Sequence, residues 1–253
     1  MGMDTVLTDT PALPPNPHAD SLQALNQHIV DTGFAFVPGW QMRDWLAPGQ
    51  LTDWPQFSAS WDDMPHDTYM ADGGRYRRRR HATLSATAHG IQLEPHQPHY
   101  QSLDYNPLNG GVVRHFAAVD TAVATGNTMQ QVLTFCHQLF SQLGQHTDWH
   151  IEVHQFRIEA RPQAQGKPTP EGIHRDGVDY VLVMMVQRRN VSSGTTTMHD
   201  MQLRELDSFT LTSPLDCAIV DDKRCMHGVT PVEVTDPAQP AYRDVLVVTF
   251  RKR

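Results

Sequence analysis

The decisive stretch of this sequence is Pro170-Glu171-Gly172-Ile173-His174-Arg175-Asp176-Gly177-Val178-Asp179-Tyr180. His174 and Asp176 are two residues apart, and on an extended strand residues i and i+2 project from the same face. We therefore expect the imidazole and the carboxylate to point together. A second imidazole, His227, follows in the segment Asp222-Lys223-Arg224-Cys225-Met226-His227-Gly228. Two histidines and one carboxylate form the facial triad that holds iron(II) and leaves the opposite coordination positions open, which predicts a non-haem iron oxygenase.

The pattern His-x-Asp is weak evidence alone, because it occurs three times, beginning at His18, His146 and His174. His18 lies in a proline-rich stretch, and His146 follows the end of a predicted helix. Only His174 opens a long run of strand-forming residues and has a histidine at the end of another predicted strand downstream. Two alternatives stay open: a hydrogen-bonded structural pair at a strand end, and a zinc site with Cys225 as a further ligand.

Composition and charge exclude several classes of protein. The chain has 253 residues, of which 39% are hydrophobic and 19% charged, as in an ordinary globular protein. The net charge of −8 argues against a general nucleic-acid binder. Three cysteines without a CxxC pair predict free thiols in a reducing compartment. Neither a secretory signal nor an apolar run of transmembrane length is recognisable, so we expect a cytoplasmic protein without a membrane partner.

Hydrophobic periodicity predicts a mainly β chain preceded by helices. Residues 1–19 hold four prolines and are expected to form a flexible arm, and residues 20–253 a single domain. Helices are expected from residue 22 to Gly33, in short pieces over 40–65, and over 128–143. A hairpin is expected from strands at 68–70 and 76–85 around Asp72-Gly73-Gly74, followed by a long loop over 89–111. Further strands are predicted at 34–37, 150–160, 173–187, 195–200, 203–211, 216–221 and 243–251. This order favours a β-barrel or sandwich with helices packed on it.

Four segments carry a family resemblance. They are VHQFRI at 153–158, PEGIHRDG at 170–177, DDKRCMHGVTP at 221–231 and YRDVLVVTF at 242–250. In this order and spacing they resemble the bacterial 2-oxoglutarate/iron(II) dioxygenases that include the L-isoleucine dioxygenase group of free amino-acid hydroxylases. The resemblance is strong over the C-terminal half of the chain and loose over the N-terminal half.

The resemblance implies a double-stranded β-helix core (a jelly roll, cupin-like) with flanking helices. It implies Fe(II) held by His174, Asp176 and His227, and 2-oxoglutarate whose distal carboxylate pairs with an arginine on the last core strand. Arg243 is our choice because a guanidinium fits a carboxylate in a planar, bidentate manner, and Arg251 is the competitor. The implied reaction is the hydroxylation of a small molecule, a free aliphatic L-amino acid in the first place, with dioxygen consumed and succinate and CO2 released.

Residues on the strand over 150–160 are candidates for substrate binding. Gln155 and Arg157 alternate with His154, Phe156 and Ile158, so one face of this strand is polar. We predict that Gln155 and Arg157 bind the substrate, with a structural salt bridge as the alternative for Arg157. His154 is expected to be a core histidine or one that supports a ligand.

Other interpretations remain open at this level. Strand alternation would split the arginine run over 75–80 between two faces, which favours a solvated edge or a substrate-facing arginine over a nucleic-acid patch. A non-catalytic jelly-roll protein that binds or senses a ligand is the main alternative function. A structural β domain, with zinc or without metal, is a third. A homo-oligomer is possible with any of them.

Overall fold

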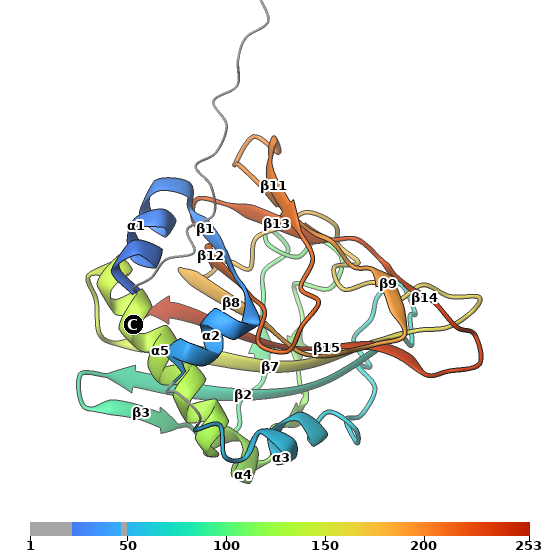
Figure 1. The fold of residues 1–253 in the computed structure, drawn as a ribbon, viewed down its shortest axis with the longest axis horizontal. Coiled ribbons are helices and arrows are strands. Elements are labelled where there is room, and N and C mark those ends of the chain that lie inside the picture. The colour runs from blue at the N-terminus through green and yellow to red at the C-terminus, as the bar shows by residue number, and fades with distance from the viewer. Residues whose placement is uncertain (1–21, 47–49) are drawn as a thin grey trace, which may run out of the picture.

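The computed structural model describes residues 22–46 and 50–253 (Figure 1). The arm expected over residues 1–19 lies outside the described residues, and the single-domain organisation stays a prediction. Within the described residues the helices are α1 (Leu22–Thr32), α2 (Gly39–Trp45), α3 (Trp54–Ala59), α4 (Thr121–Ala124) and α5 (Asn127–Gly144). The expected helices that end near Gly33 and that cover 128–143 are confirmed as α1 and α5. No helix of this part of the chain is long and apolar enough to cross a membrane.

The strands make up most of the regular structure. They are β1 (Phe34–Val37), β2 (Arg77–Thr87), β3 (Gly90–Leu93), β4 (His99–Tyr100), β5 (Val113–Arg114), β6 (Ala117–Ala118), β7 (Trp149–Ala160), β8 (Tyr180–Arg189), β9 (Val191–Ser193), β10 (Thr196–His199), β11 (Glu205–Phe209), β12 (Cys217–Asp221), β13 (Met226–Val229), β14 (Val232–Val234) and β15 (Ala241–Lys252). The mainly β architecture with flanking helices is thus as expected from the sequence.

Three expectations about strands and loops differ from the structure. Residues 68–70 form no strand, so the hairpin around Asp72 does not exist, and β2 pairs with β7 along its length instead. The strand expected over 173–187 begins only at Tyr180. The loop expected over 89–111 contains the short strands β3 and β4.

An eight-stranded sheet forms the centre of the molecule. Its order is β1-β12-β8-β15-β7-β2-β3, with β6 beside β2. The long strands β15 and β7 pair antiparallel from Ala241 opposite Ala160 to Lys252 opposite Trp149. A three-stranded sheet (β11-β10-β13) and the pair β14–β9 complete the β structure. Because side chains alternate along each strand, the large sheet has two chemically different faces.

Helices cover one of these faces. Figure 1 shows α5 lying across the long strands, with α1 and α2 beside it. The apolar stripe of α5 includes Met129, Val132, Phe140 and their neighbours at helical spacing, and it packs on Trp149 and Phe250 of the sheet. This packing forms the main hydrophobic core. The opposite face of the sheet is therefore free to carry polar side chains.

Candidate functional site

A pocket lies on the face of the large sheet that the helices leave uncovered. Its walls come from β2, β7 and β15 on one side, from β13 and residues 168–178 on another, and from residues 99–114. The lining combines an apolar part, which includes Val183, Val245 and Val247, with buried histidines and arginines and with half-buried acidic residues. The segment expected to form a long loop, 89–111, contributes His99, Gln101 and Asn106.

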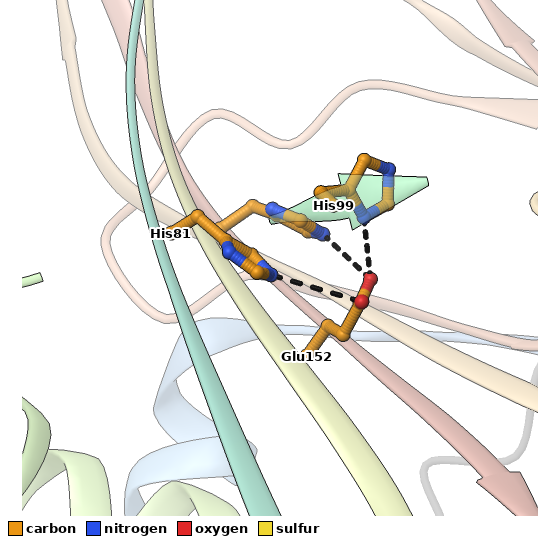
Figure 2. Close-up of side chains that lie close together, drawn as sticks. His81, His99 and Glu152 are labelled. Atoms are coloured by element: carbon orange, nitrogen blue, oxygen red, sulfur yellow. Dashed lines mark hydrogen bonds and ion pairs between the residues drawn. The ribbon is translucent and has the colours of Figure 1, made fainter. Parts of the chain in front are cut away.

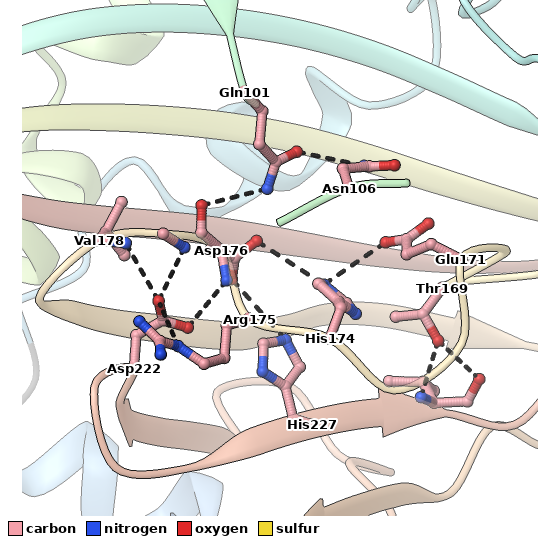
Figure 3. A network of polar contacts seen from close by, with 12 residues as sticks. Gln101, Asn106, Thr169, Glu171, His174, Arg175, Asp176, Val178, Asp222 and His227 are labelled. Carbon is pink, nitrogen blue, oxygen red and sulfur yellow. Dashed lines mark hydrogen bonds and ion pairs between the residues drawn. The ribbon is translucent and has the colours of Figure 1, made fainter. Parts of the chain in front are cut away.

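The three residues predicted to form a metal triad come together in this pocket. The backbones of His174 and His227 exchange two N–H to O hydrogen bonds of 2.9 Å, and their ring centroids are 4.6 Å apart. Oδ1 of Asp176 lies 3.7 Å from Nε2 of His174, and its Oδ2 lies 3.8 Å from Nε2 of His227 (Figure 3). The prospective ligand atoms are all within 4.8 Å of one another. This spacing allows one cation to contact all three.

The triad is positioned by a buried carboxylate rather than by the expected strand. Asp222, which is fully buried, accepts hydrogen bonds from the backbone N–H groups of Asp176, Gly177 and Val178 at 2.9, 2.8 and 3.0 Å (Figure 3). Gly177 has a φ of 81°, which favours glycine and lets the chain turn here. Nδ1 of His174 lies 3.0 Å from the carbonyl of Gly172. Donation from Nδ1 would fix the ring so that Nε2 is the nitrogen available to a metal.

The protonation states of the triad suit a divalent cation. Burial raises the pKa of Asp176, but the hydrogen bond from His174 and the electrostatic interaction with the two neighbouring imidazoles outweigh it and hold the pKa below its usual range. Burial lowers the pKa of His227 to about 4, so this ring is neutral at pH 7. For His174 burial is outweighed by Asp176 and Glu171, which raise the pKa to about 9. An ionised carboxylate between two imidazoles fits iron(II), which would displace the His174 proton on binding.

Arg243, predicted to bind 2-oxoglutarate, lines the same pocket from β15. It is only 2% exposed, and among the described residues its Nε and Nη2 have no hydrogen-bond partner. Burial and repulsion from Arg188 lower its pKa to about 10. A buried cation without a counter-charge is unfavourable, so this position favours an anionic ligand. The competing candidate, Arg251, is exposed and outside the pocket.

The structure does not bring Gln155 and Arg157 into the pocket. They lie on the helix-covered face of β7, where Gln155 donates to Oγ of Ser60 at 2.8 Å. Arg157 forms a bidentate pair with Asp244 at 2.8 and 2.7 Å and also donates to Asp62 at 2.8 Å. The side chains alternate along the strand as predicted, and Gln155 and Arg157 lie on the face turned away from this pocket. The contacts of Arg157 with Asp244 and Asp62 are those of the structural salt bridge that was the alternative interpretation.

The Arg157–Asp244 pair predicts a large effect on stability. Asp244 is fully buried, so Asp244→Ala leaves the buried Arg157 with only the exposed carboxylate of Asp62 as a partner and should lower the free energy of unfolding by about 3 kcal/mol. Asp62→Ala removes the partner whose side chain is 66% exposed and should cost less than about 1 kcal/mol. Urea denaturation followed by tryptophan fluorescence measures both. Equal losses in the two variants would contradict the assignment of Asp244 as the principal partner.

Several pocket residues were not identified as site residues from the sequence. They are the pocket-facing arginines Arg77 and Arg79 of β2, Arg114 of β5, His99 of β4, and Glu152 and His154 of β7. A signal was present, because Arg77/Arg79 and Glu152/His154 are i, i+2 pairs on strands and each pair shares a face. The arginine run is indeed split: Arg78 and Arg80 turn the other way and pair with Glu159, Asp63 and Asp120.

A buried histidine of β2 predicts acid sensitivity. His81 is fully buried, and burial lowers its pKa to about 3. The unfolded chain binds a proton near the ordinary value of 6.5 and the folded chain does not, so stability is present above 6.5 and falls as the pH decreases below it. From about pH 7.5 to about pH 5 His81 alone should lower the free energy of unfolding by about 2 kcal/mol. Urea denaturation at both pH values should show a smaller loss in His81→Gln and an unchanged loss in His89→Gln, since His89 is exposed.

Comparisons with known proteins agree with this geometry. A family model described as 2OG-Fe dioxygenase matches residues 58–249. A 3(1)-hydroxy-L-isoleucine 4-dioxygenase from Pantoea ananatis is 24% identical over 235 residues, which cover 89% of this chain and 94% of that protein. An L-isoleucine-4-hydroxylase from Bacillus thuringiensis is 26% identical over 162 residues, which cover 62% of this chain and 67% of the relative.

Solved structures show the same fold. The structure of a bsmA homolog from Methylobium petroleophilum PM1 is 32% identical and has a TM-score of 0.84, covering 92% of this chain and 93% of the other. The structure of IDO from Bacillus thuringiensis is 18% identical with a TM-score of 0.77, covering 92% of this chain and all of that one. The jelly-roll core expected from the sequence is therefore confirmed.

Proposed function

We propose that this chain, which belongs to the 2OG-Fe dioxygenase family, hydroxylates a free aliphatic L-amino acid. It is a 2-oxoglutarate-dependent enzyme that uses Fe(II). In the proposed reaction a C–H bond of the amino acid becomes C–OH, one oxygen atom of O2 enters the product, and the other enters succinate as 2-oxoglutarate loses CO2.

The observation that carries the proposal is the convergence of the triad and Arg243 on one pocket. We assign His174 (through Nε2), Asp176 and His227 as the iron ligands. We assign Arg243 as the partner of the distal carboxylate of 2-oxoglutarate. When bound, iron and 2-oxoglutarate supply the activation of dioxygen. The protein keeps Asp176 ionised and His227 neutral, holds the cosubstrate at Arg243, and surrounds the reacting carbon with a wall that excludes water.

The substrate class rests on the relatives and on the lining. Two relatives are named for the hydroxylation of isoleucine or its hydroxylated derivative. The apolar side chains of the pocket, among them Val178, Val183 and Val247, suit an aliphatic side chain. The acidic and basic groups of the same pocket suit the two charges of a free amino acid.

The test has two stages. The apo protein is titrated anaerobically with Fe(II) and 2-oxoglutarate, and a weak visible charge-transfer band is expected to grow to one equivalent. Succinate release is then measured aerobically with L-valine, L-leucine, L-isoleucine and L-methionine, with product hydroxylation followed by mass spectrometry. Substrate-dependent succinate with a matching hydroxylated product supports the proposal. A protein that binds both cofactors but releases succinate with none of these amino acids would contradict the proposed substrate, and ligand binding without any succinate would favour the non-catalytic alternative.

A further inference from the structure

We propose that Arg79 and Arg114 bind the carboxylate of the amino-acid substrate and that Glu152 binds its ammonium group. This inference rests on the proposed function and assigns the residues that would recognise a free zwitterion. The three side chains line the same pocket as the triad but belong to different strands: β2, β5 and β7. They are separate from Arg243, which would serve 2-oxoglutarate.

Arg79 and Arg114 are buried cations without a carboxylate partner. Their exposures are 5% and 1%, and within the described residues neither lies within ion-pair distance of an acid. Their guanidinium carbons lie 3.9 and 5.7 Å from the ring centroid of Phe116, so both cations sit beside one aromatic ring. The Nε of each is buried and has no hydrogen-bond partner among those residues. Arg77, in contrast, is paired with Asp67 at 2.7 Å.

This arrangement favours an anion between the two guanidinium groups. Burial, together with repulsion from Arg77 and Arg114, lowers the pKa of Arg79, and burial with repulsion from Arg77 lowers that of Arg114. Both cations are therefore held at a cost in free energy that a bound anion would relieve. A carboxylate matches the planar donor geometry of a guanidinium. The substrate carboxylate is the anion that the proposed reaction brings to this part of the pocket.

Glu152 supplies the opposite charge. Figure 2 shows His81 and His99 directed at its carboxylate, with Nδ1 of His99 2.6 Å from Oε2. Burial raises the pKa of Glu152, but hydrogen bonds from His150, His154 and His99 outweigh burial and hold the pKa below its usual range. The side chain is 17% exposed, more than the rings of His81 and His99 beside it. An ionised carboxylate at the pocket surface is a suitable partner for an ammonium group.

The same histidines could be taken for a second metal site, because His81, His99, Glu152 and His154 have ligand atoms within 4.8 Å of one another. Hydrogen bonding argues against it. Arg79 can only donate, so Nδ1 of His154, 3.1 Å from its Nη2, accepts a hydrogen bond. The proton of the neutral His154 ring then sits on Nε2, the nitrogen that faces Glu152. With the guanidinium of Arg79 beside it, this cluster supports the negative charge of Glu152 rather than holding a second metal ion.

The proposed subsite is close to the triad. Oε1 of Gln101 lies 3.4 Å from Nη2 of Arg114, and Nε2 of the same side chain donates to the backbone carbonyl of Asp176 at 3.1 Å. One glutamine thus connects an anion-binding guanidinium to the segment that carries a prospective iron ligand. An amino acid held by Arg114 and Glu152 would place its aliphatic side chain in the apolar part of the pocket, within reach of the metal.

The experiment measures binding of charge-deleted ligands to the anaerobic holoenzyme loaded with Fe(II) and 2-oxoglutarate. The probes are L-isoleucine, 3-methylpentanoate, which lacks the ammonium group, and 2-methylbutylamine, which lacks the carboxylate. Glu152→Gln should weaken L-isoleucine at least about 30-fold and leave 3-methylpentanoate unchanged. Arg79→Met and Arg114→Met should weaken L-isoleucine and 3-methylpentanoate by a similar factor and leave 2-methylbutylamine unchanged. If the activity panel selects another aliphatic amino acid, its own desamino and descarboxy analogues replace these probes.

Matched controls are available on the same strands. Glu159→Gln on β7 and Arg80→Met on β2 change side chains that pair outside the pocket, so they should leave all three affinities unchanged. The affinity for 2-oxoglutarate verifies that each variant is folded. The wild type is informative without any variant, since equal affinities for L-isoleucine and 3-methylpentanoate would overturn the role of Glu152.

The outcomes separate this inference from the proposed function. Hydroxylation of an amino acid together with unchanged affinities in Glu152→Gln and Arg79→Met would overturn the subsite alone. Bound cofactors without turnover or binding of any amino acid would overturn both. A second equivalent of iron in the wild type that Glu152→Gln loses would assign the histidine cluster to a metal and overturn the ammonium site.

Discussion

Asp176→Ala is expected to lose iron binding and iron-dependent succinate release. Asp176 is the only carboxylate of the proposed triad, its oxygens lie 3.7 and 3.8 Å from Nε2 of His174 and His227, and its charge would offset that of the cation. Even residues that only support a metal ligand change affinity or activity by about 10- to 100-fold when replaced, so loss of a ligand should exceed about 100-fold. Anaerobic titration with Fe(II), followed by the visible band and by metal analysis after desalting, measures the binding directly.

The control for this variant uses the same motif elsewhere in the chain. Asp148 follows His146 in an identical His-x-Asp pattern, but it is exposed, lies directly before β7 and does not line the pocket. Asp148→Ala should bind iron and release succinate as the wild type does. Asp176→Ala should keep its fold, because Asp222 bonds to the backbone of residues 176–178 and not to the Asp176 side chain. Unchanged iron affinity in Asp176→Ala would refute the triad.

The identity of the triad was accessible from the sequence, but its geometry was not. The types and order of His174, Asp176 and His227 sufficed to predict a metal site. The expected strand is interrupted at residues 176–178, because the backbone N–H groups there bond to the side chain of Asp222 instead of to a neighbouring strand. Such a contact joins residues far apart in the chain, and local propensity contains no information about it.

The two faces of a strand posed a similar difficulty. Alternation on β7 could be predicted, yet whether Arg157 or Glu152 faces the pocket depends on where α3 and α5 pack. A helix can cover either face of an isolated strand pattern, so periodicity alone leaves the choice open. The prediction of a hairpin around Asp72 was wrong for a different reason. The turn residues are a local signal, and the long pairing of β2 with β7 determines the structure there instead.

The arginines of the pocket form two groups with different partners. Arg243 lies beside Arg188 on the β8 side of β15, whereas Arg79 and Arg114 lie beside Phe116. Two separate anion sites suit a reaction in which a dicarboxylate cosubstrate and an amino acid occupy the pocket together. A variant of Arg243 should therefore change the affinity for 2-oxoglutarate, whereas variants of Arg79 and Arg114 should change the affinity for the amino acid.

Arg243→Met is expected to raise the KM for 2-oxoglutarate at least about 30-fold, with a much smaller effect on the affinity for the amino acid. The reason is that the buried guanidinium would be the partner of the distal carboxylate, and its removal leaves that carboxylate desolvated and unpaired. Arg243→Lys keeps the charge but loses the bidentate geometry, so it should recover only part of the affinity. Initial rates of succinate release at varied 2-oxoglutarate, and anaerobic titration of the visible band, measure the effect.

The free energy of unfolding of the Arg243→Met variant provides a second test of this role. Because Nε and Nη2 of Arg243 are buried without partners within the described residues, removing the cation should not lower the free energy of unfolding of the cofactor-free protein and should raise it by about 1 kcal/mol or more. Arg251→Met, an exposed change further along β15, should alter neither the KM nor the stability. A structural arginine would behave in the opposite way, with stability lost and the KM for 2-oxoglutarate preserved. A lower free energy of unfolding in Arg243→Met would thus indicate that Arg243 stabilises the fold. A higher one would indicate that Arg243 destabilises the cofactor-free fold and serves to bind the cosubstrate.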